Sequence, residues 1–355
     1  MLKNRRAKLE QFFVKHVLDA MLITNLHNIR YLCGFTGSEG ALLLTRDQAW
    51  LLVDSRYTIQ AKSETFAAEI RQFSDKYEEI RLLLKEQGLV RIGFESGCTT
   101  VAAFGQLSEK LPGRELVPVN AEFDLIRSSK DPGEIEHLEN VAKLASESFM
   151  SVLPMIRSGT GEAEIALELE FEMRRRGAAG RSFDFIVASG ERGAMPHGLA
   201  SGKAIASGEL VTIDYGAVLD GYCSDETVTV AVGQPDQRSR EIFDIVKDAH
   251  DRAIAAVRPG ISCRDLDAVA RNYIKDKGYG DCFGHGLGHG VGLEIHEKPV
   301  ISPRSEAVVE EGMVFTIEPG IYIPGFGGVR IEDTVVVTGD GCRLLTRVPK
   351  ELIII

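Results

Sequence analysis

The sequence predicts a mixed α/β protein of two domains, the second of which is built from two similar halves. Helical and strand-like segments alternate over residues 1–125, and a polar break containing Pro and Gly follows them. Beyond this break, the chain repeats one pattern of motifs. The chain has 355 residues, 44% of them hydrophobic and 26% charged, which is enough for two domains that each bury a core.

The first domain is expected to be an α/β unit. Its elements are predicted from amphipathic and apolar runs, as helices over 8–18, 77–87 and 100–111 and strands over 20–24, 40–45, 49–54, 91–95 and 115–119. The second and third strands are separated only by Arg46-Asp47-Gln48 and should form a hairpin. The polar cluster from Asp54 to Tyr57 is interpreted as a salt bridge at a strand end.

A domain boundary is expected within residues 125–133. The run SSKDPGE supplies Ser, Pro and Gly directly before a helical pattern over 135–155. The expected domains are therefore residues 1–127 and 128–355.

The second domain contains an internal duplication. Val211–Gly233 and Val314–Gly339 each contain an apolar strand ending in Thr-Ile-acid, a turn with glycine, and an acidic pair that opens a second β-branched strand. The upstream sequences also agree, because an Arg-x-Gly turn stands 27 residues before Asp184 (157 to 184) and 27 before His285 (258 to 285). Such a repeat predicts two pseudo-symmetric halves whose sheets join, with a site at the seam.

Three of the chain's eight histidines lie in the stretch FGHGLGHGVGLEIHE, residues 283–297. Buried imidazoles need partners for two nitrogens, so this crowding favours metal binding or acid–base chemistry over a glycine-rich turn with incidental histidines. The glycines argue against one helical face for His285 and His289, so at most one of them need bind a metal. The HExxH pattern of helical zinc peptidases does not occur here.

Four carboxylates are brought together by the duplication. It aligns Asp214 with Glu318, and it likewise aligns Asp225 with Glu332. Separately, the acidic pairs could be solvated charges at hairpin tips, but together they would repel one another unless a multivalent cation bound between them. Four carboxylates and one histidine form an oxygen-rich ligand set, which favours Mn²⁺ over a thiolate-type zinc site and two ions over one.

Composition excludes several other classes. The net charge of −11 argues against nonspecific binding to nucleic acid or an anionic membrane. Six scattered cysteines without a CxxC pair suit a reducing cytoplasm, and we expect no export signal or membrane anchor. GxGxxG, P-loop and GxSxG motifs do not occur, so nucleotide binding and serine hydrolysis have no local support.

The motifs HGLGHGVGLEIHE, IDYG, SDET, TIEPGIY and GVRIED together resemble those of the pita-bread metallopeptidases of the Xaa-Pro aminopeptidase and Xaa-Pro dipeptidase (prolidase) group. GFTGS at 34–38 and DSRY at 54–57 are similar to the creatinase-type amino-terminal domain, so the resemblance covers nearly the whole chain. It implies a creatinase-like α/β domain followed by a duplicated pita-bread catalytic domain. Creatinase itself lacks the metal ligands, and the methionine aminopeptidases lack such an amino-terminal domain.

The resemblance also implies roles for individual residues. The implied metal ligands are Asp214, Asp225, His289, Glu318 and Glu332, which would hold two divalent ions, expected to be Mn²⁺ with Co²⁺ and Zn²⁺ as alternatives. Asp225 and Glu332 are expected to bridge both ions. The implied catalytic residues are His197, His285, His296, Glu318 and Arg330. Arg330 is expected to orient Glu332 or an oxygen of the intermediate, and Val228 stands where relatives commonly carry arginine.

The expected function is hydrolysis of Xaa-Pro bonds at the free amino terminus of dipeptides or short peptides. A hydroxide bridging the two metals would attack the scissile carbonyl while Glu318 guides the proton. A cytoplasmic homodimer is expected. Three alternatives stay open: a prolidase limited to dipeptides, an aminopeptidase of other specificity, and a binding protein that keeps the fold without catalysis.

Overall fold

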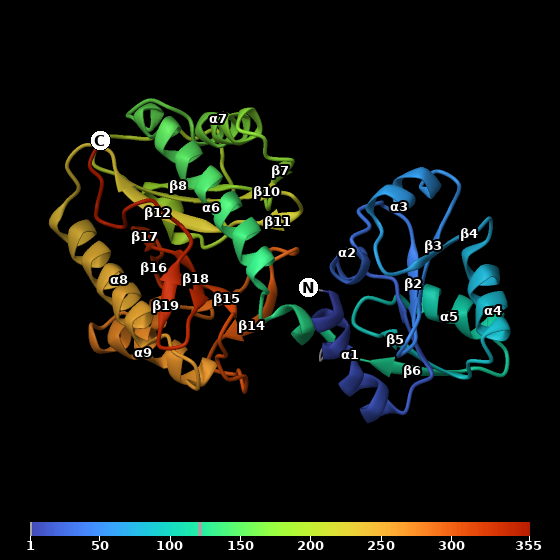
Figure 1. Cartoon of the computed structure of the whole chain (residues 1–355). Helices are drawn as coiled ribbons and strands as arrows, with labels where there is room; N and C mark the ends of the chain where they lie inside the picture. The colour runs from blue at the N-terminus through green and yellow to red at the C-terminus, as the bar shows by residue number, and fades with distance from the viewer. Residues whose placement is uncertain (1, 120–122) are drawn as a thin grey trace. The chain divides into compact units, whose positions relative to one another are not determined.

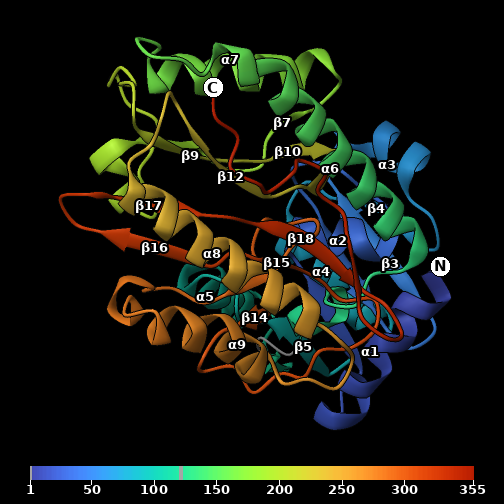
Figure 2. The same cartoon turned by 90° about the vertical axis from the view of Figure 1, so that its left-hand side faces the viewer.

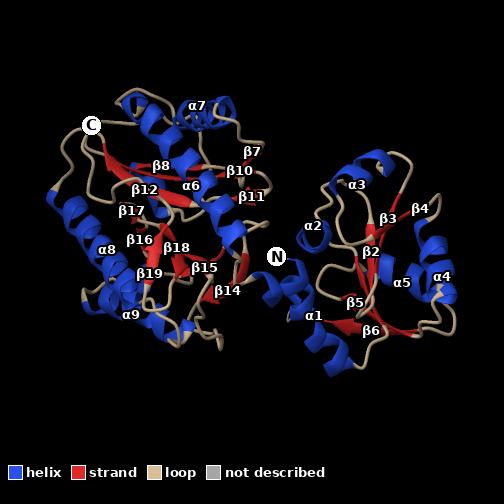
Figure 3. Ribbon diagram, in the orientation of Figure 1, coloured by secondary structure: helices blue, strands red, loops and turns tan. Residues whose placement is uncertain are grey.

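The computed structural model describes residues 2–119 and 123–355. It divides into two compact units, Met1–Ile126 and Arg127–Ile355 (Figure 1). Both units combine helices with sheets, which confirms the expected mixed α/β class (Figure 3). In the described part of the chain, no helix is both long enough and apolar enough to cross a membrane.

The first unit is built on a six-stranded mixed sheet of order β4-β3-β2-β1-β5-β6. Its strands are β1 (Ala20–Ile23), β2 (Ala41–Leu44), β3 (Ala49–Val53), β4 (Glu69–Gln72), β5 (Arg91–Glu95) and β6 (Glu115–Val119). Its helices are α1 (Leu2–His16), α2 (Leu26–Cys33), α3 (Thr58–Glu64), α4 (Lys76–Glu86) and α5 (Val101–Lys110), followed by a 3₁₀ helix at Phe123–Arg127. Helices α4 and α5 cover one face of the sheet, and α1 and α2 lie on the other (Figures 1 and 3).

The sequence missed three elements of this unit. Helix α2 has only eight residues, so its apolar periodicity is short, although Asn25 caps it by accepting hydrogen bonds from His27 N and Asn28 N. Helix α3 is shorter still, and β4 is an edge strand without a fully buried residue. The interpretation of the Asp54 cluster is confirmed, because Arg56 Nη2 lies 2.6 Å from Asp54 Oδ2 at the end of β3.

The second unit begins with helix α6 (Pro132–Val152), three residues earlier than expected. Asp131 forms a capping box with Glu134, and Pro132 occupies the first turn, where its missing N–H costs nothing. The further helices are α7 (Glu162–Arg175), α8 (Gln237–Ala256) and α9 (Cys263–Asp276), with 3₁₀ helices at Leu153–Met155, Gly190–Ala194 and Gly280–Cys282.

The strands of the second unit form several small sheets. They are β7 (Gly180–Arg181), β8 (Ile186–Ser189), β9 (Leu210–Tyr215), β10 (Ala217–Leu219), β11 (Tyr222–Cys223), β12 (Glu226–Ala231), β13 (Gly288–Gly290), β14 (Glu297–Ile301), β15 (Val314–Ile317), β16 (Gly320–Ile323), β17 (Gly327–Arg330), β18 (Asp333–Val337) and β19 (Cys342–Leu344).

The duplication appears as two halves with the same succession of elements. Each half begins with two helices, α6–α7 in one and α8–α9 in the other (Figure 2). Antiparallel strands follow, in the order β12-β9-β8 in the first half and β18-β15-β13 in the second. The equivalent glycines Gly159 and Gly260 have positive φ angles of 91° and 89°. Their N–H groups donate to equivalent carbonyls, of Ile205 and Val309. These matching contacts show that the sequence repeat corresponds to a structural repeat.

Candidate metal centre

The duplicated strands place four carboxylates at the seam between the halves. Asp214 lies in β9, and Asp225 stands directly before β12. In the second half, Glu318 follows β15 and Glu332 stands directly before β18. The strand starts are bonded to each other, because Glu332 N donates to Thr227 O at 3.2 Å. The four carboxylates therefore lie where the two halves join.

One pocket of about 380 Å³ collects all nine of the site residues that the sequence indicated. They are Asp214, Asp225, His289, Glu318 and Glu332 of the expected ligand set, with His197, His285, His296 and Arg330. Apolar side chains complete the wall, among them Phe183, Ile186 and Val300.

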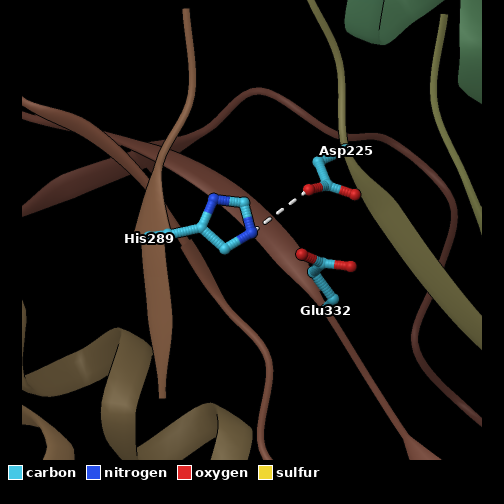
Figure 4. A group of neighbouring side chains, drawn as sticks. All are labelled: Asp225, His289 and Glu332. Carbon is cyan, nitrogen blue, oxygen red and sulfur yellow. Dashed lines mark ion pairs between the residues drawn. The ribbon is translucent and has the colours of Figure 1, made fainter. Parts of the chain in front are cut away.

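Asp225, His289 and Glu332 lie close enough to share one cation. Each offers one ligand atom, and these atoms lie within 4.8 Å of one another (Figure 4). His289 Nε2 lies 3.5 Å from Asp225 Oδ2 and 3.4 Å from Glu318 Oε1. This nitrogen thus faces two carboxylates, which is the arrangement expected of a histidine ligand.

The ring of His289 is oriented by the backbone of its own strand. Its Nδ1 lies 3.1 Å from Gly290 O, which leaves Nε2 to face the carboxylates. Its backbone N–H donates to Thr316 Oγ1 at 3.1 Å. A Cβ on Gly288 would lie 1.9 Å from Thr316 O, so this close approach of β13 to β15 requires glycine.

Threonine hydroxyls fix two of the carboxylates. Thr227 Oγ1 donates to Glu332 Oε2 at 2.7 Å, and Thr316 Oγ1 donates to Glu318 Oε1 at 3.0 Å. These hydrogen bonds leave Glu332 Oε1 and Glu318 Oε2 available to other groups. The threonines thus act as orienting groups for the expected ligands.

Arg330 is buried and contacts Asp214 rather than Glu332. Its Nη2 lies 2.7 Å from Asp214 Oδ2, and its Nη1 donates to Tyr322 Oη at 2.9 Å and to Pro196 O at 3.1 Å. Its link to Glu332 runs through Thr227, whose Oγ1 accepts a hydrogen bond from Arg330 Nε at 3.2 Å and donates to Glu332 Oε2. Arg330 therefore ties together Asp214, β16 and the loop that carries His197.

The electrostatics of the pocket favour a bound cation. Burial and the neighbouring carboxylates raise the pKa of Asp225 and of Glu332 well above their usual values. Burial also raises the pKa of Glu318 to about 7. Asp214 Oδ1 is buried and, among the described residues, has no hydrogen-bond partner. These oxygens and His289 Nε2 fit divalent metal ions.

The other histidines lie around the ligand set. His285 Nε2 lies 2.8 Å from Tyr322 Oη, and burial lowers the pKa of His285 to about 4, so its ring is neutral near pH 7. The rings of His289 and His296 pack edge to face, with their centroids 4.4 Å apart. His197 is exposed on the loop after the 3₁₀ helix Gly190–Ala194 and lines the pocket.

Sequence reasoning missed the residues that orient the site. Tyr322 was not singled out, although a tyrosine in the apolar strand GIYI is a signal, because its hydroxyl needs a partner when buried. Thr227 lies two residues after the expected ligand Asp225, and Thr316 lies two residues before the expected ligand Glu318. Val228 is buried in β12 and, by strand alternation, faces away from Thr227 and the pocket.

Two family models match the chain. Residues 5–129 match the Creatinase/Prolidase N-terminal domain, and residues 136–339 match Metallopeptidase family M24. The chain belongs to metallopeptidase family M24. The expectation of a metallopeptidase with a creatinase-type amino-terminal domain is confirmed.

Several similar proteins match nearly the full length of the chain. An Xaa-Pro dipeptidase of Pyrococcus furiosus is 40% identical over 353 residues, 99% of this chain and 100% of the relative. A solved Xaa-Pro dipeptidase from Bacillus anthracis has a TM-score of 0.97 at 43% identity and covers 100% of both chains. A solved X-Pro aminopeptidase from Thermotoga maritima has a TM-score of 0.90 at 39% identity, covering 96% of this chain and 98% of that chain.

Proposed function

We propose that this family M24 chain is a metal-dependent exopeptidase that hydrolyses Xaa-Pro bonds at the free amino terminus of dipeptides and short peptides. The observation that carries the proposal is the gathering of four carboxylates and His289 around one pocket. The similarity to proteins named Xaa-Pro dipeptidase and X-Pro aminopeptidase supports the substrate class.

The proposed metal centre holds two divalent ions. The residues that would hold these ions are Asp214, Asp225, His289, Glu318 and Glu332, all of which line the pocket. Four carboxylates supply too many oxygens and too much charge for one small ion, and oxygen ligands favour Mn²⁺. When bound, the ions supply Lewis acidity and lower the pKa of water.

Glu318 is proposed to accept the proton of the attacking water. Its Oε1 is held by Thr316, and its Oε2 lies 4.0 Å from His285 Nδ1. A carboxylate in this position can act as a general base towards water held beside it. His285 and His296 both line the pocket beside the expected ligands, and one of them is proposed to help protonate the departing proline nitrogen.

The remaining residues would position the peptide. His197 and His296 line the pocket and can donate to the carbonyl oxygen or the tetrahedral intermediate. The apolar wall of Phe183, Ile186 and Val300 suits a pyrrolidine ring. A prolyl nitrogen carries no N–H, so the site need not supply an acceptor for it.

The proposal is tested with a peptide panel on protein stripped of metal and then supplied with Mn²⁺. We expect kcat/KM for Ala-Pro or Ala-Pro-Ala to exceed that for Met-Ala-Ala by at least ~10², about 2.7 kcal/mol of transition-state discrimination. Comparable rates on Met-Ala-Ala would indicate an aminopeptidase of other specificity. Absence of hydrolysis despite bound Mn²⁺ would indicate a binding protein. The ratio of Ala-Pro to Ala-Pro-Ala distinguishes a dipeptidase from an enzyme that admits longer peptides.

A cytoplasmic location and a homodimer stay predictions. Six scattered cysteines without a CxxC pair support a reducing compartment. Light scattering during size-exclusion chromatography measures the oligomeric state directly.

A further inference from the structure

A buried ionic bridge lies behind the pocket, on the other face of the strands that follow the expected ligands Asp225 and Glu332. Glu226 follows Asp225 and opens β12, while Asp333 follows Glu332 and opens β18. Successive residues of an extended chain point to opposite faces. Asp225 and Glu332 line the pocket, and their neighbours therefore face away from it.

Lys350 joins these two carboxylates. Its Nζ lies 2.6 Å from Glu226 Oε1 and 3.4 Å from Asp333 Oδ1. The side chains of Lys350, Glu226 and Asp333 are 6%, 1% and 3% exposed, respectively. Burial alone would lower the pKa of Lys350, but the two carboxylates raise it above its ordinary value. The bridge thus consists of one ammonium between two buried carboxylates, one from each half of the duplication.

Other contacts fix the remaining oxygens of the bridge. Glu226 Oε2 accepts hydrogen bonds from Ser146 Oγ at 2.7 Å and from Tyr215 Oη at 3.0 Å. Asp333 Oδ2 lies 3.2 Å from His250 Nε2, and Asp333 Oδ1 accepts from Thr346 Oγ1. Because each carboxylate oxygen has a partner, both side chains are held in one orientation.

The carboxyl-terminal segment carries Lys350 across both halves. Leu345 N donates to Thr334 O in β18, and Ala231 N in β12 donates to Ile353 O, each at 2.9 Å. This segment, red in Figure 1, ends near β12. Lys350 lies between these two attachments, where it can join the starts of the two strands.

We propose that Lys350 is a positioning residue of the metal centre: by bridging Glu226 and Asp333 it fixes the separation of Asp225 and Glu332. This inference rests on the metal centre of the proposed function. Removal of the ammonium would leave two buried carboxylates to repel each other, each one residue from an expected ligand. Partners that orient metal ligands typically change metal affinity by 10–100-fold.

The test compares Lys350→Met and Lys350→Arg with the matched control Lys130→Met. Lys130 is also buried, and its Nζ lies 3.1 Å from Glu297 Oε2; Glu297 adjoins His296, which lines the pocket but is not an expected metal ligand. Each metal-free protein is titrated with Mn²⁺ by calorimetry. Circular dichroism records folding and Tm, and electron paramagnetic resonance records the coupling between bound Mn²⁺ ions.

We expect Lys350→Met to weaken Mn²⁺ binding by ~10–100-fold and to change the coupled signal. Lys350→Arg should restore most of the affinity, because arginine keeps the charge. Lys130→Met should lower Tm without changing Mn²⁺ affinity. Unchanged Mn²⁺ affinity and coupling in folded Lys350→Met would overturn the inference, even if Tm falls.

A second variant keeps the test decisive if Lys350→Met does not fold. The double change Glu226→Gln with Lys350→Met removes one positive and one negative charge. Its Mn²⁺ affinity and the coupling between its bound Mn²⁺ ions are measured in the same way. The outcome is also separable from that of the proposed function. A wild-type protein that binds Mn²⁺ but cleaves no peptide contradicts only the proposed function, whereas equal Mn²⁺ binding by wild type and variant contradicts only the role of Lys350.

Discussion

At the scale of single residues, the proposed ligands Asp225 and His289 give the first prediction. Asp225→Asn and His289→Ala should each reduce Mn²⁺-dependent turnover of Ala-Pro by at least ~10², because each removes a donor that the ions need. Metal content and turnover are measured on the same samples. The control His137→Ala removes a histidine whose side chain is 45% exposed and that does not line the pocket. Retention of more than a few per cent of wild-type turnover at saturating Mn²⁺ would show that the ligand is misassigned.

Glu318 gives a second prediction, because it is proposed both to bind metal and to accept a proton from water. Glu318→Gln should lower kcat by ~10²–10⁴-fold while much of the Mn²⁺ stays bound, since an amide keeps one oxygen but cannot accept a proton. Turnover and bound metal are compared at saturating Mn²⁺. Parallel loss of both would mean that Glu318 serves only as a ligand.

The residues that could be predicted from the sequence are those that the duplication and the histidine motif single out. Asp214 and Glu318 were paired by the repeat alone, and the structure brings them to one pocket. Tyr322 and Lys350 could not be found in this way, because their roles depend on contacts with distant residues. Lys350 meets Glu226 across 124 positions of sequence, and no local pattern records such a contact.

At the scale of elements, the approach of β13 to β15 gives a third prediction. Gly288→Ala should destabilise the protein by about 1–3 kcal/mol or more and displace His289, because its Cβ would meet Thr316 O at 1.9 Å. Gly284→Ala is the matched control in the same stretch, since no other part of the chain that the structure describes comes within 4 Å of a Cβ built there. Thermal unfolding and Mn²⁺ binding are measured for both. Equal Tm values for the two variants would contradict the role assigned to β13.

Elements with long apolar or periodic patterns were predictable, and those with short or polar patterns were not. The strands β1 and β2 are buried throughout, so their apolar runs are clear in the sequence. The edge strand β4 reads EIRQ and carries no such signal. Its place in the sheet comes from pairing with β3, which is a tertiary contact.

At the scale of the whole molecule, the crowded carboxylates should control the stability of the metal-free protein. The folded-state pKa values of Asp225, Glu332 and Glu318 are raised, so their contribution to stability is present at low pH and is lost as the pH rises. Folding lowers the pKa of His285 from 6.5 to about 4, so this residue changes the pH dependence of stability only below pH 6.5. The pKa of His250 is raised by folding, so His250 also contributes to the loss of stability as the pH rises above 6.5.

The fourth prediction is therefore a lower Tm for metal-free protein at about pH 8.5 than near pH 6.5. Saturating Mn²⁺ should shrink this difference, because the bound ions stabilise the charged carboxylates, while the part due to His250 remains. Calorimetric scans at the two pH values, with and without Mn²⁺, provide the comparison. A Tm that rises with pH in the metal-free protein would contradict the proposed crowding of charge.

Hydrolysis of Xaa-Pro bonds is proposed to require two divalent ions, which the carboxylates and His289 of the pocket would hold. The most direct test of this requirement is the turnover of Ala-Pro measured against the number of Mn²⁺ ions bound per chain, starting from fully stripped protein. We predict no turnover without metal and a maximum once two ions are bound. Full turnover in excess chelator, or a maximum already reached with one ion, would contradict the two-metal mechanism.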